Sequence, residues 1–190
     1  MVSLLEESHP KPSLTKEPDS HPLTSPIQSY QLCQSISGNE TELLIQTFED
    51  RIFVVVTQNG KVGCLTQASL SQFTPLLQAS LPTEIDKDDS PLRILSVLPS
   101  PPPQMKLTPL LGSPPQQTLH ELYVSQIATL IWWALQTSGQ PRRSVVVGLA
   151  LQKGNNQQER DEDEQVLADD ERERYAGIMD MVSQWSGPSQ

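Results

Sequence analysis

Few side chains in this sequence combine the type and the spacing that catalysis requires. The chain has three histidines. His9 and His21 lie in a stretch rich in Pro and Ser, and His120 lies in the first turn of a predicted helix, where we expect it to face solvent. No Ser-His-Asp or Cys-His arrangement can be placed on the predicted elements. We therefore predict no catalytic residues and expect that the protein is not an enzyme.

Metal and cofactor sites are not predicted either. Cys33 and Cys64 form no Cys-x-x-Cys pair, so we interpret them as small buried residues in a reducing compartment. The acidic run 159–174 lacks the Asp/Asn and Gly spacing of a calcium loop and is predicted to be solvated. No glycine-rich phosphate motif occurs. Trp132 and Trp133 are expected to pack in a helix rather than to bind a ligand.

Composition indicates one domain with additional segments. The chain has 190 residues and 17 prolines, and only 36% of its residues are hydrophobic. We predict a disordered tail at 1–28, a single domain at 29–185 and a short C-terminal tail at 186–190. Within the domain we predict a Pro-rich insert at 82–106 and an acidic loop at 153–168.

Charge and hydropathy narrow the classes of partner. The net charge is −10 and no basic patch appears, because Arg142-Arg143 is only a pair, so nucleic acid is not an expected ligand. The longest apolar stretch, 127–135, is far shorter than the ~20 residues that a membrane span needs. The N-terminal residues lack the apolar core of a signal peptide. These patterns favour a soluble, intracellular protein that binds neither nucleic acid nor membrane.

Period-two alternation predicts a β-meander of four strands with short turns, over 29–37, 40–48, 51–58 and 61–67. Asn59-Gly60 is the strongest turn signal, because a type I′ turn needs positive φ at both central residues. If each loop has two residues, the opposed pairs are Leu32 with Ile45, Ile45 with Val54, Leu43 with Val56, and Val54 with Leu65. One face then collects Leu32, Ile36, Leu43, Ile45, Ile52, Val54, Val56 and Leu65. The other collects Cys33, Leu44, Phe48, Phe53, Val55, Val62 and Cys64.

The remaining pattern adds two strands and two helices. Residues 106–112 suit an edge strand, where Pro109 is tolerated, and 144–152 suit a buried strand. Residues 93–98 fit either a short strand or a helical turn. A capping box, Thr118-x-x-Glu121, opens a helix that ends near Gly139, and helical spacing recurs between Tyr175 and Trp185. The predicted fold class is α+β: an antiparallel β-meander sheet of about six strands with two helices packed on one face.

The second face of this sheet is unusually apolar. A sheet with helices on one side normally has polar residues on the other. Apolar patches of several hundred Å² usually mark interfaces, so we predict a dimer interface there, formed by Leu44, Phe48, Phe53, Val55 and Val62. The alternative is that the connector 68–106 folds over this face. We expect Val55→Asp to disrupt dimerisation and Gln58→Ala to leave it intact.

The hairpin sequence resembles the proteasome assembly chaperone 3 family. In IFVVVTQNGKVGCL (52–65) a Val-rich strand runs into Thr57-Gln58, a turn, Gly60-Lys61 and Gly63. Residues 107–112, 118–135 and 144–152 and the C-terminal helix resemble later elements of that family. The resemblance spans 29–67 and 107–185, with insertions. The Pro-rich and acidic segments depart from the family pattern.

This resemblance implies a non-catalytic chaperone for 20S proteasome assembly, located in the cytoplasm and nucleus. It would pair with a proteasome assembly chaperone 4-like subunit, or with itself as a homodimer, and bind α-type subunits transiently while their ring forms. Gln58, Asn59 and Lys61 are the expected partner contacts. Two other readings stay open: a small dimeric adaptor domain of a trafficking or GTPase-scaffold complex, and an enzyme with a site near His120 or the cysteines.

Overall fold

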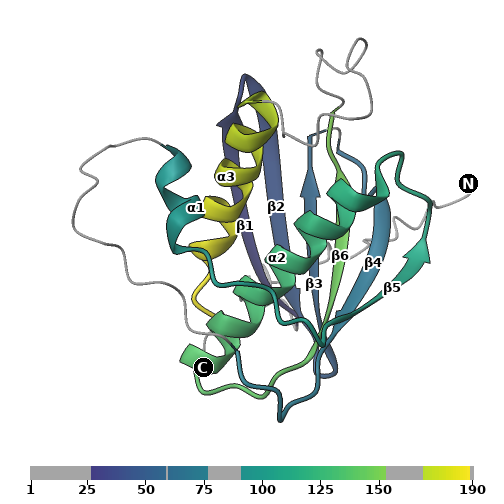
Figure 1. Ribbon diagram of the computed structural model, residues 1–190, viewed down its shortest axis with the longest axis vertical. Coiled ribbons are helices and arrows are strands. Elements are labelled where there is room, and N and C mark those ends of the chain that lie inside the picture. The colour runs from purple at the N-terminus through teal and green to yellow at the C-terminus, as the bar shows by residue number, and fades with distance from the viewer. Residues whose placement is uncertain (1–26, 59, 77–90, 153–168, 189–190) are drawn as a thin grey trace, which may run out of the picture.

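A six-stranded sheet with helices on one side forms the fold in the computed structural model, which describes residues 27–58, 60–76, 91–152 and 169–188 (Figure 1). The strands are β1 (Gln28–Ile36), β2 (Asn39–Thr47), β3 (Arg51–Thr57), β4 (Cys64–Ser69), β5 (Lys106–Leu111) and β6 (Ser144–Ala150). The helices are the 3₁₀-helix η1 (Pro91–Arg93), α1 (Ile94–Val97), α2 (Gln117–Thr137) and α3 (Asp169–Ser183). The predicted α+β class, with about six strands and helices on one face, is confirmed.

The hairpin between β2 and β3 has the predicted register. Leu43 is opposite Val56 and Ile45 is opposite Val54, and all four side chains are buried on the helix side. The two-residue Glu49-Asp50 turn accounts for this register, because Phe48 N–H donates to the Arg51 carbonyl at 2.9 Å. Local alternation was sufficient here, since directly opposed residues share one face of the sheet.

The hairpin between β1 and β2 is displaced by two residues from the predicted register. Leu32 lies opposite Leu43 and not Ile45. The turn residues are Ser37 and Gly38, with φ of +47° and +79°, as a type I′ turn requires. A shift by two keeps every side chain on its predicted face, whereas a shift by one would exchange the two faces.

The predicted hairpin between β3 and β4 is wrong. The strand order is β1-β2-β3-β6-β4-β5, so β6 lies between them, parallel to β3 and antiparallel to β4. Val54 therefore faces Val147, and Leu65 faces Gly148. The physical reason is that β3 and β6 both contain runs of valine, a β-branched residue that favours strands, and both occupy central positions with a paired strand on each side. Residues 60–63 pass close over β6 and do not close a hairpin from β3 to β4.

This topology also changes the faces of two β4 residues. Leu65 is level with Gly148, which is itself level with Val55, so Leu65 lies on the helix-free face. Cys64 is level with Leu149 and lies on the helix side. Both assignments are the reverse of the prediction, because the register of β4 is set by β6 and not by the Asn59-Gly60 turn.

The helices cover one face of the sheet and leave the other face, here called the helix-free face, without helices. α2 packs over β4 and β6, and α3 packs beside α2 and over β1. α2 begins at Gln117, so the residue at the N-cap position is Gln116 and not Thr118, and the predicted capping box is wrong. Thr118 lies inside the helix, and Gln117 Nε2 donates to Glu121 Oε1 at 2.8 Å. The predicted end is confirmed: α2 ends at Thr137, before Gly139 with φ of +69°.

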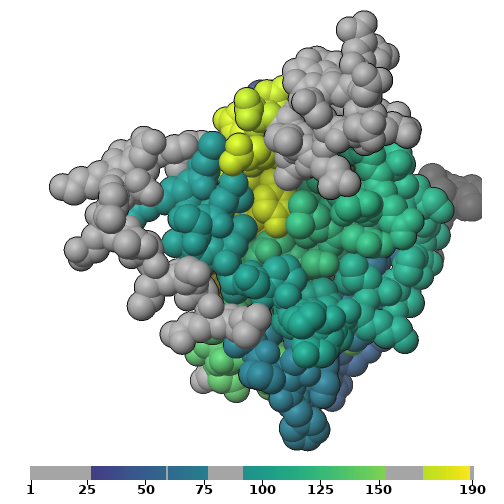
Figure 2. Space-filling model, viewed as in Figure 1, coloured from purple at the N-terminus to yellow at the C-terminus, as the bar shows by residue number. Residues whose placement is uncertain are grey.

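Residues 91–102 of the connector lie on the helix side. The sequence left open whether residues 93–98 form a strand or a helical turn. They are helical: Arg93 ends η1 and Ile94–Val97 form α1, and both helices pack against α3. Gln126 Nε2 donates to the Pro99 carbonyl at 2.9 Å, and Pro99 and Pro102 are buried. Figure 2 shows this teal segment over the green α2. This segment therefore leaves the helix-free face uncovered.

Several predicted segments fall wholly or partly outside the described residues. These are most of the tail 1–28, the part of the connector at 77–90, the acidic loop 153–168 and the last two residues of the tail 186–190. Their predicted character stays a prediction.

Candidate protein-binding surface

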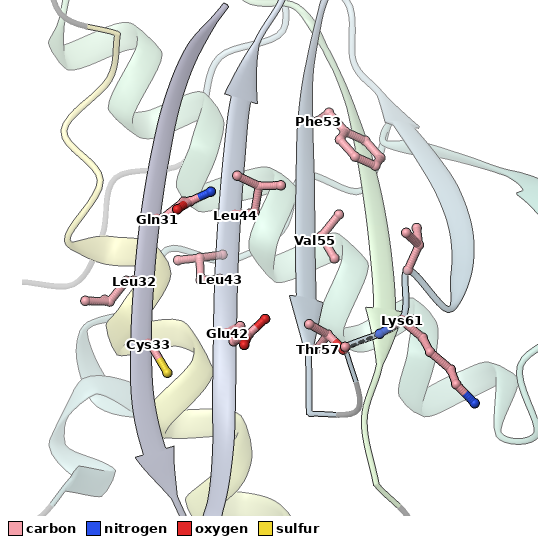
Figure 3. Close-up of a pocket in the computed structure, with 12 residues that line it drawn as sticks. Gln31, Leu32, Cys33, Glu42, Leu43, Leu44, Phe53, Val55, Thr57 and Lys61 are labelled. Atoms are coloured by element: carbon pink, nitrogen blue, oxygen red, sulfur yellow. Dashed lines mark hydrogen bonds between the residues drawn. The ribbon is translucent and has the colours of Figure 1, made fainter. Parts of the chain in front are cut away.

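A groove of about 550 Å³ lies on the helix-free face of the sheet (Figure 3). Its apolar part comes from Leu44 on β2, Phe53 and Val55 on β3, and Val62 from the segment after β3. Figure 3 shows this side with the helices behind the sheet. The groove is lined by Gln31, Leu32, Cys33, Glu42, Leu43, Leu44, Phe53, Val55, Thr57, Gly60, Lys61 and Val62.

The apolar side chains of this groove remain reachable from solvent to different degrees. Val55 forms the floor and is 7% exposed, whereas Val62 is 45% exposed. Leu44 and Phe53 are half-buried. The groove is therefore an open concave surface that fits a side chain or strand from outside.

Two glycines explain why Val62 lies on this face. A Cβ on Gly148 would lie 2.7 Å from the Val62 carbonyl oxygen, and a Cβ on Gly63 would lie 1.8 Å from the Leu149 carbonyl oxygen. Gly63 also has φ of +70°, a conformation that other residues rarely adopt. Only glycine at both positions lets the segment 60–63 pass this close over β6.

The structure brings four of the five predicted interface residues together and leaves Phe48 apart. Phe48 follows the end of β2, is half-buried and does not line the groove. Its backbone carbonyl accepts a hydrogen bond from Arg143 Nη1 at 3.0 Å, which fixes the turn between β2 and β3.

The three predicted partner contacts occupy different places. Lys61 is exposed at the rim of the groove, and its backbone N–H donates to Thr57 Oγ1 at 3.1 Å. Gln58 is buried: its Nε2 donates to Thr41 Oγ1, and its Oε1 accepts from the Gln152 N–H, each at 3.0 Å. Asn59 lies outside the described residues. Lys61 is thus available to a partner, while the Gln58 amide joins β2, β3 and the end of β6.

Cys33 lies on the rim and is exposed, so the prediction that both cysteines are buried is wrong; Cys64 is half-buried. The Cys33 thiol donates to Glu40 Oε1 at 3.2 Å. That hydrogen bond is the main cause that raises the pKa of Cys33, and the nearby charges of Glu40 and Glu42 act in the same direction. The thiol is therefore held in its protonated form, which is a weak nucleophile.

His120 is buried, so the prediction that it faces solvent is wrong. It lies 3.0 Å from Thr66 Oγ1 through Nε2, on the helix side of β4. Burial lowers the pKa of His120, although the charge of Glu121 acts in the opposite direction. The pair is separated from the groove by the sheet.

No three His, Cys, Asp or Glu side chains in the described ranges come together in a way that could hold a metal ion. Among the same residues, no helix has both the length and the hydrophobicity to cross a membrane.

A buried polar cluster near the start of α3 has no clear signal in the sequence. Glu171 and Arg174 form a buried ion pair one helical turn apart. Tyr123 donates to Glu171 Oε1 at 2.7 Å, and Arg174 Nη1 donates to the Gln152 carbonyl at 2.6 Å. Burial raises the pKa of Tyr123 to about 12, so its hydroxyl keeps the proton that it donates. In the sequence, the i, i+3 spacing of Glu171 and Arg174 is the same as that of an exposed ion pair on a helix, so it does not indicate burial.

Comparison with known proteins gives a likeness among solved structures but none among families or curated proteins. No protein-family model and no curated protein matches the chain. Among solved structures, the chain is similar to one in the crystal structure of a novel chaperone complex for yeast 20S proteasome assembly. The TM-score is 0.39 at 17% sequence identity, over 65% of this chain and 80% of that chain.

Proposed function

We propose that this protein is a non-catalytic chaperone of 20S proteasome assembly. It pairs through its helix-free sheet face with a related assembly chaperone, of the proteasome assembly chaperone 4 type, or with a second copy of itself. The pair then binds α-type subunits transiently in the cytoplasm and nucleus.

The observation that carries this proposal is the apolar groove on the uncovered side of the sheet. Leu44, Phe53, Val55 and Val62 present apolar surface there, and residues 91–102 of the connector pack on the opposite side. Two sheets pack about 10 Å apart through interdigitating side chains, which suits a groove of this kind. The hairpin resemblance at 52–65 supports the choice of partner.

The proposed mechanism is selection by affinity and involves no covalent step. A dimer that binds one arrangement of neighbouring α-type subunits more tightly than others favours that arrangement in the growing ring. Release before the particle matures requires interfaces of modest size that a later subunit displaces.

The test is co-expression with a chaperone 4-type partner and individual α-type subunits, followed by native mass measurement. Val62→Asp is the main variant, because Val62 is 45% exposed and a carboxylate there should leave the isolated fold intact. Leu122→Asp is the matched control: Leu122 is 39% exposed on α2, on the opposite side of the molecule. Gln58→Ala is a poor control because the Gln58 amide is bonded inside the fold.

We expect the wild type and Leu122→Asp to give the mass of a heterodimer or homodimer and of its complex with an α-type subunit. Val62→Asp should shift the chain to monomer, and Val55→Asp should do so at least as strongly. Equal dimer formation by the wild type and Val62→Asp would contradict the proposal that the dimer forms through the sheet face. Capture of small GTPases or coat subunits in place of α-type subunits would assign the chain to an adaptor complex instead.

A further inference from the structure

The turn after β4 carries an aromatic side chain that is almost fully in solvent. Phe73 is 96% exposed, far more than any other large hydrophobic residue in the described ranges. The segment 70–76 forms the lower tip of the molecule in Figures 1 and 2. This tip is at the end of the sheet where β3 and β6 begin, whereas Lys61 lies beyond the other end of β3.

This turn is held in a defined shape by contacts to the body of the protein. Arg142 Nη1 donates to the carbonyls of Ser71 and Thr74, the latter at 2.9 Å. Within the turn, Thr74 N–H donates to the Ser71 carbonyl at 3.1 Å. The Arg142 guanidinium also lies 5.8 Å from the ring centroid of Trp132, which is buried in the core. Arg142 therefore fastens the turn to α2 and to the start of β6.

A rigid turn that exposes phenylalanine is suited to binding. An aromatic side chain that enters a partner pocket is a common centre of binding energy at protein interfaces. A turn already fixed before binding loses little conformational entropy when the complex forms. A free loop would instead have to be ordered by the partner.

The chemistry of the tip favours a protein partner. Residues 70–76, LSQFTPL, carry no charged side chain, as is typical of the centre of a protein interface. Membrane-surface and nucleic-acid sites need lysine or arginine side chains that are free to bind phosphate. The Arg142 guanidinium beside this turn is instead engaged by the Ser71 and Thr74 carbonyls and lies against Trp132, and the chain has a net charge of −10.

We infer that the Ser71–Thr74 turn is a second protein-binding surface, in which Phe73 inserts into an apolar pocket of a partner protein. Because the tip projects, the partner must supply the pocket. The surface is separate from the groove, so a chain paired through its sheet face keeps Phe73 free. The identity of the partner as an α-type subunit rests on the proposed function.

The test measures the dissociation constant of the purified chaperone dimer for each 20S α-type subunit, presented singly on a biosensor. We expect Phe73→Ala to raise the dissociation constant by about tenfold or more for the subunit that binds. Gln72→Ala, an exposed change in the same turn, should stay within about twofold. Arg142→Lys, which loses the two-carbonyl contact, should give an intermediate rise and faster hydrogen exchange at Thr74 N–H.

The possible outcomes separate this inference from the proposed function. If the wild type binds an α-type subunit and Phe73→Ala binds it equally well, the inference is overturned and the proposed function stands. If the wild-type dimer binds no α-type subunit, the proposed binding of α-type subunits is wrong. The assignment of an α-type subunit as the partner of Phe73 is then wrong as well. If Phe73→Ala dissociates the dimer itself, the turn binds within the dimer. If the wild type binds phosphatidylserine vesicles and Phe73→Ala does not, the turn binds a membrane. Either result would also overturn the inference.

Discussion

At the scale of single residues, burial of polar side chains depends on a partner that the local sequence does not reveal. His120 occupies the first turn of α2, where solvent exposure is usual, yet it is buried against Thr66 of β4. Gln58 follows a strand and precedes a turn, yet its amide bonds to Thr41 and Gln152. In both cases a strand distant in sequence supplies the hydrogen bond that makes burial tolerable.

The buried His120 should make the stability of the protein depend on pH. Its folded pKa lies below the unfolded value of about 6.5, so the unfolded chain binds a proton more readily than the folded chain. The free energy of unfolding should therefore fall as pH drops from about 6.5 towards the folded pKa, and this contribution should stay constant above about 7. Urea unfolding at pH 7.5 and 5.5 measures the loss.

His120→Gln is the comparison variant, because an amide can still bond to Thr66 Oγ1 but does not titrate. Carboxylates that titrate near pH 5 are common to both proteins, so the difference between their losses isolates His120. We expect the variant to lose less stability than the wild type between the two pH values. An identical loss in both proteins would mean that His120 is equally basic in the folded and unfolded chains.

At the scale of elements, α3 is held to the body of the fold by polar contacts as well as by its apolar stripe. Arg174 bonds to Glu171 and to the Gln152 carbonyl beyond the end of β6, and Tyr123 of α2 bonds to Glu171. These contacts fix the first turns of α3 beside α2. Apolar packing alone would permit rotation or sliding of the helix.

Removal of the buried cation should therefore be costly. We expect Arg174→Met to lower the free energy of unfolding by about 3–5 kcal/mol, because Glu171 keeps its charge in a buried site without its partner. The double variant Glu171→Gln/Arg174→Met should lose less than Arg174→Met alone, since no buried charge remains. Urea denaturation monitored by Trp fluorescence provides both values.

Arg172→Met is a control within the same helix. Arg172 is about half exposed and lies 4.0 Å from Asp169, so its loss should cost no more than about 1 kcal/mol. A similar cost for Arg172→Met and Arg174→Met would show that the buried cluster contributes nothing beyond an ordinary surface pair.

The elements also show which parts of the fold the sequence determines. Alternation and short turns predict β1, β2 and β3 with their correct faces, because these strands pair with immediate neighbours. The same reasoning fails for β4, since β6 enters the sheet between β3 and β4 from far along the chain. The hairpin signal at Asn59-Gly60 does not exclude a wider connection, and the close approach at Gly63 depends on β6.

At the scale of the whole molecule, the two sides of the sheet have different roles in the fold. One side is covered by α2, α3 and residues 91–102 of the connector, while the other keeps an apolar groove. The candidate site was largely predictable, because Leu44, Phe53 and Val55 follow from period-two alternation alone. Val62 was predicted on this face as well, but from a β3–β4 hairpin that does not exist; it reaches the face because glycines 63 and 148 let its segment pass close over β6.

The exposed thiol at the rim of the groove offers a direct test of which side a partner covers. In a Cys64→Ser background, Cys33 should react with a maleimide in the free chain, slowly because Glu40 raises the pKa of its thiol. Binding of the chaperone partner should slow this reaction by about tenfold or more if the partner sheet covers the groove, since alkylation needs an accessible thiolate.

A Leu122→Cys variant, made in a chain from which both native cysteines are removed, reports on the helix side and should react equally fast with and without the partner. Slower labelling of the Leu122→Cys variant, with unchanged labelling of Cys33, would instead place the interface on the helix side and contradict the sheet-face proposal.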